Sequence, residues 1–314
     1  MKTDILHITN GDTTTNYLKK LNFSGNFITW REMLCEGKTV ADVGSDLFWK
    51  TRFRFLNTTY NISKQQFKAY TINEYQQLFG LRESRQIILW FDSDLFCQIN
   101  LLGLLSWLKK YHKASDVFLI CGDKVNHNKK LFSFTELSKA QITKHYNNKT
   151  LLSEEDIAYA AYVWQLYCSK NPLRIETVIK QRQNTTFIYL ENALKLHLQR
   201  FPSVENGLNN LEQFVLKTVK NGTFSSKKEL VLKLLKEQEV FGFGDIQYLN
   251  CIQQLTALFS NLNPVILAKK GEEVLNNKII FLSQLPDKNQ YFGGAYKYNF
   301  VYNNTTKKLM KNTN

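Results

Sequence analysis

The chain has 314 residues, of which 43% are hydrophobic, and it carries a formal net charge of +14. Such a length has room for about two domains, and the apolar content is enough for a sizeable core, which excludes a largely disordered chain. No secretory leader follows Met1 and no apolar run approaches the ~20 residues of a membrane span, so we expect a soluble cytoplasmic protein.

Charge and cysteine spacing narrow the function classes further. The basic excess is spread along the chain, whereas a dedicated nucleic-acid-binding surface needs a dense patch. The spacing of the cysteines excludes a zinc ribbon and a thioredoxin-type pair, and scattered thiols are typical of a reducing compartment. The five are Cys35, Cys97, Cys121, Cys168 and Cys251.

The N-terminal part alternates strand and helix patterns. A short buried strand over 5–9 leads into the turn Asn10-Gly11-Asp12 and a helix over 13–21, with Asp12 or Thr13 as its N-cap. A second strand is predicted over 25–30, and residues 45–79 are expected to form helical pieces.

The most strongly apolar strand pattern covers 86–91 and is typical of a strand buried on both faces. It is followed by Asp92-Ser93-Asp94, a helix over 95–111 and a strand over 117–121. Repeated strand–turn–helix units predict a Rossmann-like, mostly parallel α/β sheet over residues 1–148.

The rest of the chain is predicted to be largely helical. Residues 149–204 form a helical connector, with helices over 153–169 and 187–200 and a break at Pro172. Residues 205–314 are expected to form a winged-helix-like α+β domain, with helices over 208–219, 226–238 and 245–259, a β-like segment over 278–283 and a frayed tail from Lys307.

Parallel α/β sheets bind ligands at the carboxyl ends of their strands, where this chain has two polar turns. Asp12, Asp92 and Asp94 would suit a hard cation, with Mg²⁺ as the candidate cofactor, if the two strands are neighbours. The alternative is that Asp12 and Asp94 only cap helices. His7, Asp12 and Asp94 are the candidate catalytic residues, although a lone histidine in a buried strand is more often a structural core residue than a catalyst.

Further polar and aromatic residues are predicted to bind a ligand beside these carboxylates. Arg31 or Arg52 could hold an anion by a bidentate contact, or pin a loop through an ion pair with Glu32, Glu36 or Asp92. A single glycine at position 11 falls short of a phosphate-loop fingerprint. The candidate ligand-binding residues are Asn10, Gly11, Thr13, Trp30, Arg31, Glu36, Arg52 and Gln98.

The order of the C-terminal helices is compatible with nucleic-acid binding, but the lack of basic residues in the third of them argues against it. The third helix of a winged helix enters the major groove, but residues 245–255 contain no Lys or Arg to neutralise phosphate. A module used for packing or partner binding is therefore favoured, with nucleic acid as the less supported partner.

At these residues the chain resembles a bacterial family of unknown function, domain of unknown function 1835, together with its companion C-terminal domain. The resemblance rests on motifs spread over most of the chain. They are Leu6-His7-Ile8-Thr9-Asn10-Gly11-Asp12, Trp30-Arg31-Glu32 with Glu36-Gly37, Leu89-Trp90-Phe91 with Asp94-Leu95-Phe96 and Gln98, Phe201-Pro202 with Gly207-Leu208, and Phe292-Gly293-Gly294.

The chain departs from this family at four positions. Thr13 stands where Ser is common, Lys38 where Pro is usual, and Asp92-Ser93 where Glu-His is common. The missing His weakens a metal or general-base role in that turn. The resemblance places the family's polar motifs at the same two strand ends, which makes a site there more plausible, but it implies no activity.

Three functions remain open from the sequence. The leading one is an α/β domain that binds a polar or anionic small molecule or nucleotide, with metal-assisted hydrolysis or group transfer as its chemistry. The second is a ligand-sensing regulator with a nucleic-acid-binding domain, and the third is a non-catalytic interaction module.

Overall fold

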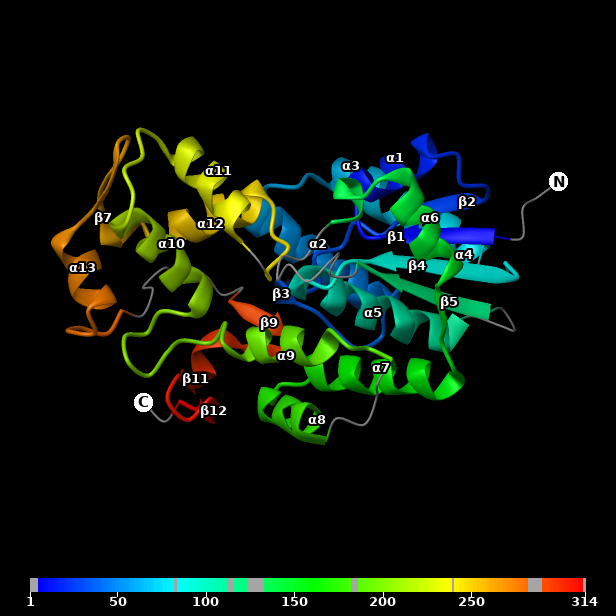
Figure 1. Cartoon of the computed structure of the whole chain (residues 1–314). Coiled ribbons are helices and arrows are strands. Elements are labelled where there is room, and N and C mark those ends of the chain that lie inside the picture. Colours follow the sequence, from blue (N-terminus) through cyan, green and yellow to red (C-terminus); the bar gives the residue numbers. More distant parts are fainter. Residues whose placement is uncertain are drawn as a thin grey trace.

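A computed structural model of the chain describes residues 5–81, 84–111, 116–122, 133–181, 186–238, 240–281 and 290–312. These residues form a mixed α/β protein around a five-stranded, mostly parallel sheet of order β2-β1-β4-β5-β6 (Figure 1), as the alternating pattern predicts. Only β6 runs antiparallel to its neighbour, and it was not expected. The strands are β1 Ile5–Thr9, β2 Asn26–Thr29, β4 Gln86–Phe91, β5 Asp116–Cys121 and β6 Thr150–Leu151.

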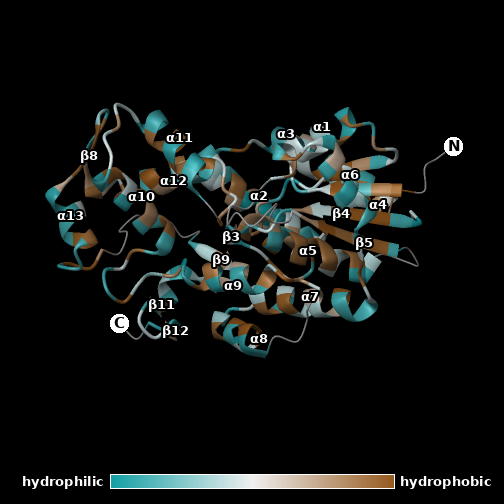
Figure 2. Cartoon of the chain, in the orientation of Figure 1, coloured by the Kyte–Doolittle hydropathy of each residue, from teal (hydrophilic) through white to brown (hydrophobic). Residues whose placement is uncertain are grey.

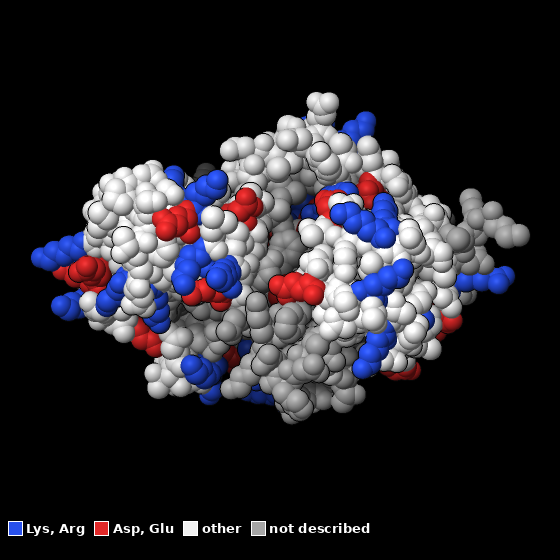
Figure 3. Space-filling model, turned by 45° about the horizontal axis from the view of Figure 1, so that its top comes forward, with Lys and Arg blue, Asp and Glu red and all other residues white. Residues whose placement is uncertain are grey.

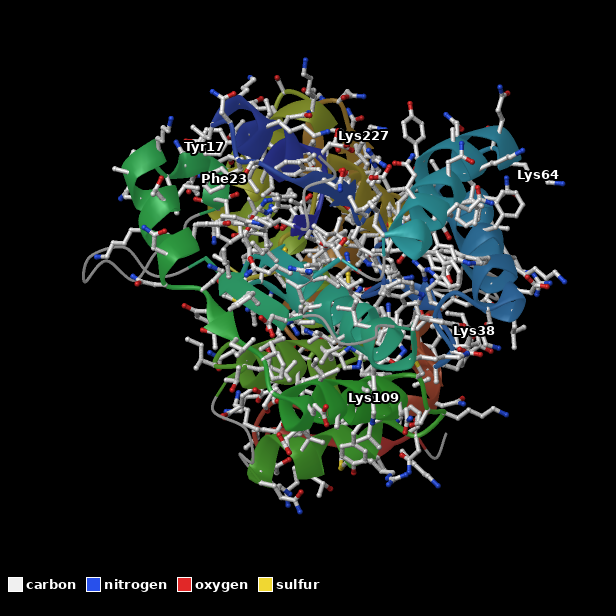
Figure 4. All side chains as sticks on the ribbon, turned by 90° about the vertical axis from the view of Figure 1, so that its right-hand side faces the viewer. Tyr17, Phe23, Lys38, Lys64, Lys109 and Lys227 are labelled. Carbon is white, nitrogen blue, oxygen red and sulfur yellow. The ribbon has the colours of Figure 1, made fainter. Side chains whose placement is uncertain are left out.

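Helices cover both faces of the sheet, which is why β4 is an uninterrupted apolar run. From Ile87 to Phe91 every residue of this strand is fully buried. The helices α1 Asp12–Lys20 and α6 Lys139–Asn147 cover one face, where Tyr17 and Phe23 lie in Figure 4. On the other face α5 Leu95–Tyr111 is apolar on nearly all sides because it lies between the sheet and α7 Glu154–Tyr167 (Figure 2).

Helices also fill the stretch between β2 and β4, as predicted. They are α2 Asp46–Tyr60, α3 Lys64–Phe67 and α4 Asn73–Gly80, with a π-helical turn at Lys68–Ile72. The connector is helical too and continues from α7 into α8 Ile175–Gln181 and α9 Leu190–Leu198. Within the described ranges, no helix is long and apolar enough to span a bilayer.

A second lobe follows, at the left of Figure 1, and its outline differs in part from the prediction. The predicted helix over 245–259 ends at Gln254, and the antiparallel ribbon forms from residues 259–267 instead of 278–283. Residues 278–281 pair with no described strand, and 282–283 lie outside the described residues. The elements are α10 Asn210–Lys220, α11 Lys227–Glu237, α12 Asp245–Gln254, β7 Phe259–Leu262, β8 Val265–Leu267 and α13 Lys269–Leu275.

The end of the chain leaves this lobe and returns to the N-terminal part. Here β9 Tyr291–Gly293 pairs in parallel with β3 Gly37–Lys38 and antiparallel with β10 Ala295–Tyr296. A hairpin of β11 Phe300–Asn303 and β12 Lys308–Lys311 follows. The expected frayed tail is therefore wrong for residues 308–311, whose backbone groups are paired with β11.

A furrow separates the two lobes on the face shown in Figure 3. Basic and acidic side chains are interspersed on both sides of it, without a dense basic stripe on that face. This distribution agrees with the diffuse charge expected from the sequence.

The loop between β2 and β3 is held by Arg52, a fully buried residue of α2. Its guanidinium donates to the Glu32 carboxylate at 2.8 Å and to the carbonyl oxygens of Met33, Glu36 and Lys38 at 2.7–3.1 Å. A planar fork of five donors fits such an arrangement, which a lysine could not reproduce. Arg52 therefore holds this loop in place, and its buried guanidinium is engaged by protein acceptors and not exposed to a ligand, contrary to its predicted binding role.

We expect Arg52→Met to destabilise the protein by about 3–5 kcal/mol, because the Glu32 carboxylate would stay buried without its partner. Chemical denaturation of both proteins measures the difference. The matched control is Arg54→Met, two residues on and exposed, which should change stability by less than about 0.5 kcal/mol. Equal effects of the two substitutions would contradict the structural role of Arg52.

Candidate functional site

The carboxyl ends of β1 and β4 lie side by side, which confirms the condition on which the predicted site depended. Thr9 pairs with Trp90, and the backbone N–H of Asn10 donates to the Trp90 carbonyl at 3.2 Å. From here the chain continues to opposite sides, since β2 flanks β1 and β5 flanks β4. This is the topological switch point at which doubly wound sheets bind their ligands.

Two carboxylates and a thiol gather just after β4. Ligand atoms of Asp92, Asp94 and Cys97 all lie within 4.8 Å of one another. Both carboxylate side chains are half-buried, and the Oδ1 atom of Asp92 is fully buried without a hydrogen-bond partner among the described residues. Asp94 Oδ1 accepts the Cys97 backbone N–H at 2.8 Å, so the predicted capping role of Asp94 is confirmed as well.

Burial and mutual repulsion make these carboxylates reluctant to ionise. Burial raises the pKa of Asp92 well above its usual value, and the nearby Asp94 charge raises it further. Burial also raises the pKa of Asp94 to about 6, against the hydrogen bonds from Cys97 that lower it. Burial and the neighbouring carboxylates raise the pKa of the Cys97 thiol, which excludes the activated thiolate of a cysteine nucleophile.

Amide side chains hold this turn in place. Asn100 donates to Asn10 Oδ1 at 2.7 Å and to the Glu32 carbonyl, while its own Oδ1 accepts from the Leu34 N–H at 2.9 Å. Asn10 in turn donates to Cys97 Sγ at 3.0 Å. Asn10 therefore positions the cluster with its side chain, and Asn100, an amide within an apolar helix, is the partner that sequence reasoning missed.

Gln98 has a similar positioning role. Its side-chain amide is buried and donates to the Asp92 carbonyl at 2.9 Å, which fixes the backbone of the turn that carries both carboxylates. Gln98 therefore positions the backbone of Asp92, and its ligand-binding role stays a prediction.

The first turn of α1 faces the same edge of the sheet. The helix begins at Asp12 with Gly11 as its N-cap, and no side chain caps it, so the predicted cap by Asp12 or Thr13 is wrong. Gly11 has a φ of 111°, and the space where its side chain would lie is open for 4 Å. Free N–H groups at a helix N-terminus attract anions, and the exposed Thr13 hydroxyl lies in this turn.

Asp12 and Arg31 are bound to each other instead of facing the carboxylate cluster. Arg31 donates to both Asp12 oxygens, at 2.7 and 2.9 Å, and to Glu74 at 3.2 Å. The hydrogen bond from Arg31 lowers the pKa of Asp12. The predicted metal set is thus corrected, because Asp12 is not grouped with Asp92 and Asp94, and Arg31 holds carboxylates of the chain itself in place of an anionic ligand.

Three further predicted residues lie away from the cluster. His7 is fully buried, receives the Trp90 indole N–H on Nδ1 at 3.1 Å, and has Nε2 3.1 Å from the Ser24 carbonyl. Burial lowers its pKa, so it is a neutral core histidine and not the predicted catalyst. Trp30 is buried in the core, and Glu36 accepts from the Tyr60 hydroxyl on the far side of the Arg52 loop.

The second lobe closes over the start of α5. The first two backbone N–H groups of this helix donate to the carbonyls of Val240 and Phe241, at 2.9 and 3.1 Å. Gly242 follows with a φ of 68°, and a Cβ atom there would overlap the Asp94 carboxylate. The segment between α11 and α12 thus completes the site, and the sequence contains no local signal for this contact beyond its glycines.

Comparisons with known proteins add little to this geometry. No family model and no curated protein matches the chain. One solved structure to which it is similar is the DNA-binding, cleavage and re-ligation domain of Plasmodium falciparum topoisomerase II. The similarity covers 81% of this chain and 42% of that one, at 10% identity and a TM-score of 0.44, which is too low to carry an argument.

The pKa of Asp94 predicts a pH-dependent stability. The unfolded chain has a carboxyl pKa of about 3.9, so between that value and about 6 the folded state binds the extra proton. Stability should therefore fall as pH rises from about 4 to 7, by roughly 2 kcal/mol more than in Asp94→Asn, which keeps the cap. Chemical denaturation at several pH values with a chelator measures this.

The control for that experiment is Asp116→Asn, at an exposed position outside any helix. Its stability should follow the wild-type pH profile. A profile of Asp94→Asn that runs parallel to the wild type would show that Asp94 keeps an ordinary pKa.

Proposed function

We propose that the edge of the sheet where β1 and β4 end binds a divalent cation together with an anionic small molecule, such as a nucleotide or another phosphate ester. The observation that carries the proposal is the buried, unpartnered Oδ1 atom of Asp92 next to Asp94. A buried polar atom without a partner is costly, and two adjacent carboxylates repel. A cation between them removes both costs.

The donor set favours a hard cation. Asp92 and Asp94 offer carboxylate oxygens, which Mg²⁺ prefers. The third member of the group, Cys97, has a raised pKa and already receives a hydrogen bond from Asn10, so the neutral thiol is a poor ligand. We therefore expect Asp92 and Asp94 to hold Mg²⁺ and Cys97 to stay outside its coordination sphere.

The open first turn of α1 supplies the complementary half of the site. Its N–H groups and the space beside Gly11 suit a phosphate, and the cation would neutralise the opposite side of the same group. Mg²⁺ would supply Lewis-acid polarisation of a phosphoryl oxygen. Hydrolysis or group transfer is the reaction class that this arrangement supports best.

The cation is the first part of the proposal to test. Isothermal titration with Mg²⁺ and with Mn²⁺ should show one site, and Asp92→Asn should weaken binding at least tenfold, or by about 1.4 kcal/mol. Asp12→Asn is the control, because Asp12 pairs with Arg31 outside the cluster. Equal loss in both variants, or no binding to the wild type, would remove the cation from the proposal.

The anionic ligand needs a separate screen. Thermal unfolding with nucleoside mono-, di- and triphosphates, each with and without Mg²⁺, should show stabilisation that depends on both components. Stabilisation without Mg²⁺ that survives in Asp92→Asn would place the ligand elsewhere.

A second candidate function comes from the order of elements in the second lobe. We propose that α10, the bridge of Phe224 to Val265, α11, α12 and the β7–β8 ribbon form a winged helix. In that fold α12 would read the major groove. Its exposed residues are Asp245, Ile246, Leu249 and Gln253, none of them basic, and Gln247 on its other face contacts Met33. This favours a winged helix that docks on the N-terminal lobe.

Duplex DNA binding tests the alternative. A nucleic-acid role predicts affinity that falls with salt, and a slope reduced by about 0.9 for each phosphate contact removed. The exposed lysines Lys228 and Lys236 on α11 are the contacts to replace with Ala. An absence of binding at low salt would leave the docking role alone.

We also propose that the chain is related to domain of unknown function 1835. The support for this relation is positional: the quoted motifs lie at the two strand ends, at the Arg52 loop, between α9 and α10, and at β9, which pairs with β3. Membership would name a family without adding an activity.

A further inference from the structure

A second polar cleft lies between the two lobes, away from the Asp92–Asp94 cluster. Its enclosed interior is about 60 Å³, and the empty space is about 560 Å³ when the open mouth is included, so only the edge of a small molecule would enter it. The N-terminal lobe contributes the Glu36–Gly37 turn and the end of α2, and the second lobe contributes one face of α12. Residues around β9 close the remaining side.

The charges of this cleft are already neutralised within the protein. Lys297 donates to Glu212 at 2.7 Å, and both side chains are buried. Arg200 lies 3.7 Å from Glu36 and donates to the Cys35 carbonyl. The cleft therefore has two cations and two anions in pairs, and it offers no net charge to attract an ion.

One buried amide of the cleft, by contrast, has unused hydrogen-bonding capacity. Gln290 is 8% exposed, and its Nε2 atom has no partner among the described residues. Asn250 and Gln254 lie one turn apart on α12, line the same cleft and are half-buried. Leaving a buried amide unpaired costs free energy that a ligand would recover.

We propose that this cleft binds an uncharged small molecule whose edge presents hydrogen-bond donors and acceptors side by side. Side-chain amides recognise such edges bidentately, as Asn and Gln recognise the edge of adenine. The bases of nucleosides and the vicinal hydroxyls of sugars share this chemistry. Because the walls come from both lobes, the ligand would bridge α12 and the Glu36–Gly37 turn.

The test uses the full chain with two sets of probes, the four ribonucleosides and the monosaccharides glucose and ribose. Isothermal titration should detect binding of one set, and thermal unfolding should shift upward with its concentration. Asn250→Leu/Gln254→Leu should weaken this binding at least about tenfold, since it removes two amides and retains the side-chain volume.

The matched control is Gln253→Leu, on the same helix but exposed and outside the cleft. It should bind the probe as the wild type does. Gln290→Leu is a second probe of the cleft: it should also weaken binding, and it should not lower the unfolding temperature, because it removes an unpaired buried amide.

Three outcomes would overturn the proposal: no binding of either probe set at concentrations up to about 10 mM, unchanged binding in the double variant, or a nucleotide that binds the cleft far more tightly than its nucleoside. The proposal does not depend on the cation site. Asp92→Asn should leave nucleoside or sugar binding intact, so a failure of one site is distinguishable from a failure of the other.

Discussion

The parallel pairing of β1 with β4 is the constraint on which the candidate site depends. Residues 81 apart in sequence pair in register, and the ladder continues one step past β1 through the N–H of Asn10. After β1 the chain continues to one side of this pair, towards β2, and after β4 it continues to the other side, towards β5. The pairing therefore places an uncapped helix start, the Gly11 turn and two carboxylates at one edge of the sheet.

The second lobe is part of this site and not an appendage. The first two N–H groups of α5 have no acceptor within the helix, and the carbonyls of Val240 and Phe241 accept their hydrogen bonds. Gly242 then lies against Asp94, where any side chain would collide. The second lobe therefore contributes to the burial that raises the pKa of Asp94.

Several polar residues that the sequence predicts to be functional have structural roles instead. Arg52 and Glu32 form a buried pair that holds the loop after β2, and Arg31 binds Asp12 and Glu74. Burial of Arg52 and Glu32 requires a counter-charge for each of them, which the other supplies, whereas the Arg31–Asp12 pair is partly exposed. Among the buried polar atoms without a partner in the described residues, two lie at candidate sites: Asp92 Oδ1 at the sheet edge and Gln290 Nε2 between the lobes.

Local pattern was sufficient to predict the strands β1, β4 and β5, the helices α5 and α7, and the turns that carry Asp92 and Asp94, because burial dictates the spacing of apolar residues within one element. It failed where the deciding contact was distant. His7 is a core residue because Trp90 and Ser24 meet its two nitrogens, and Asp12 is removed from the metal set by Arg31. The ribbon at 259–267, the cover over Asp94 and the interlobe cleft depend on pairing between segments far apart in sequence. A single sequence specifies which residues must be buried, and only the folded chain decides which of them meet.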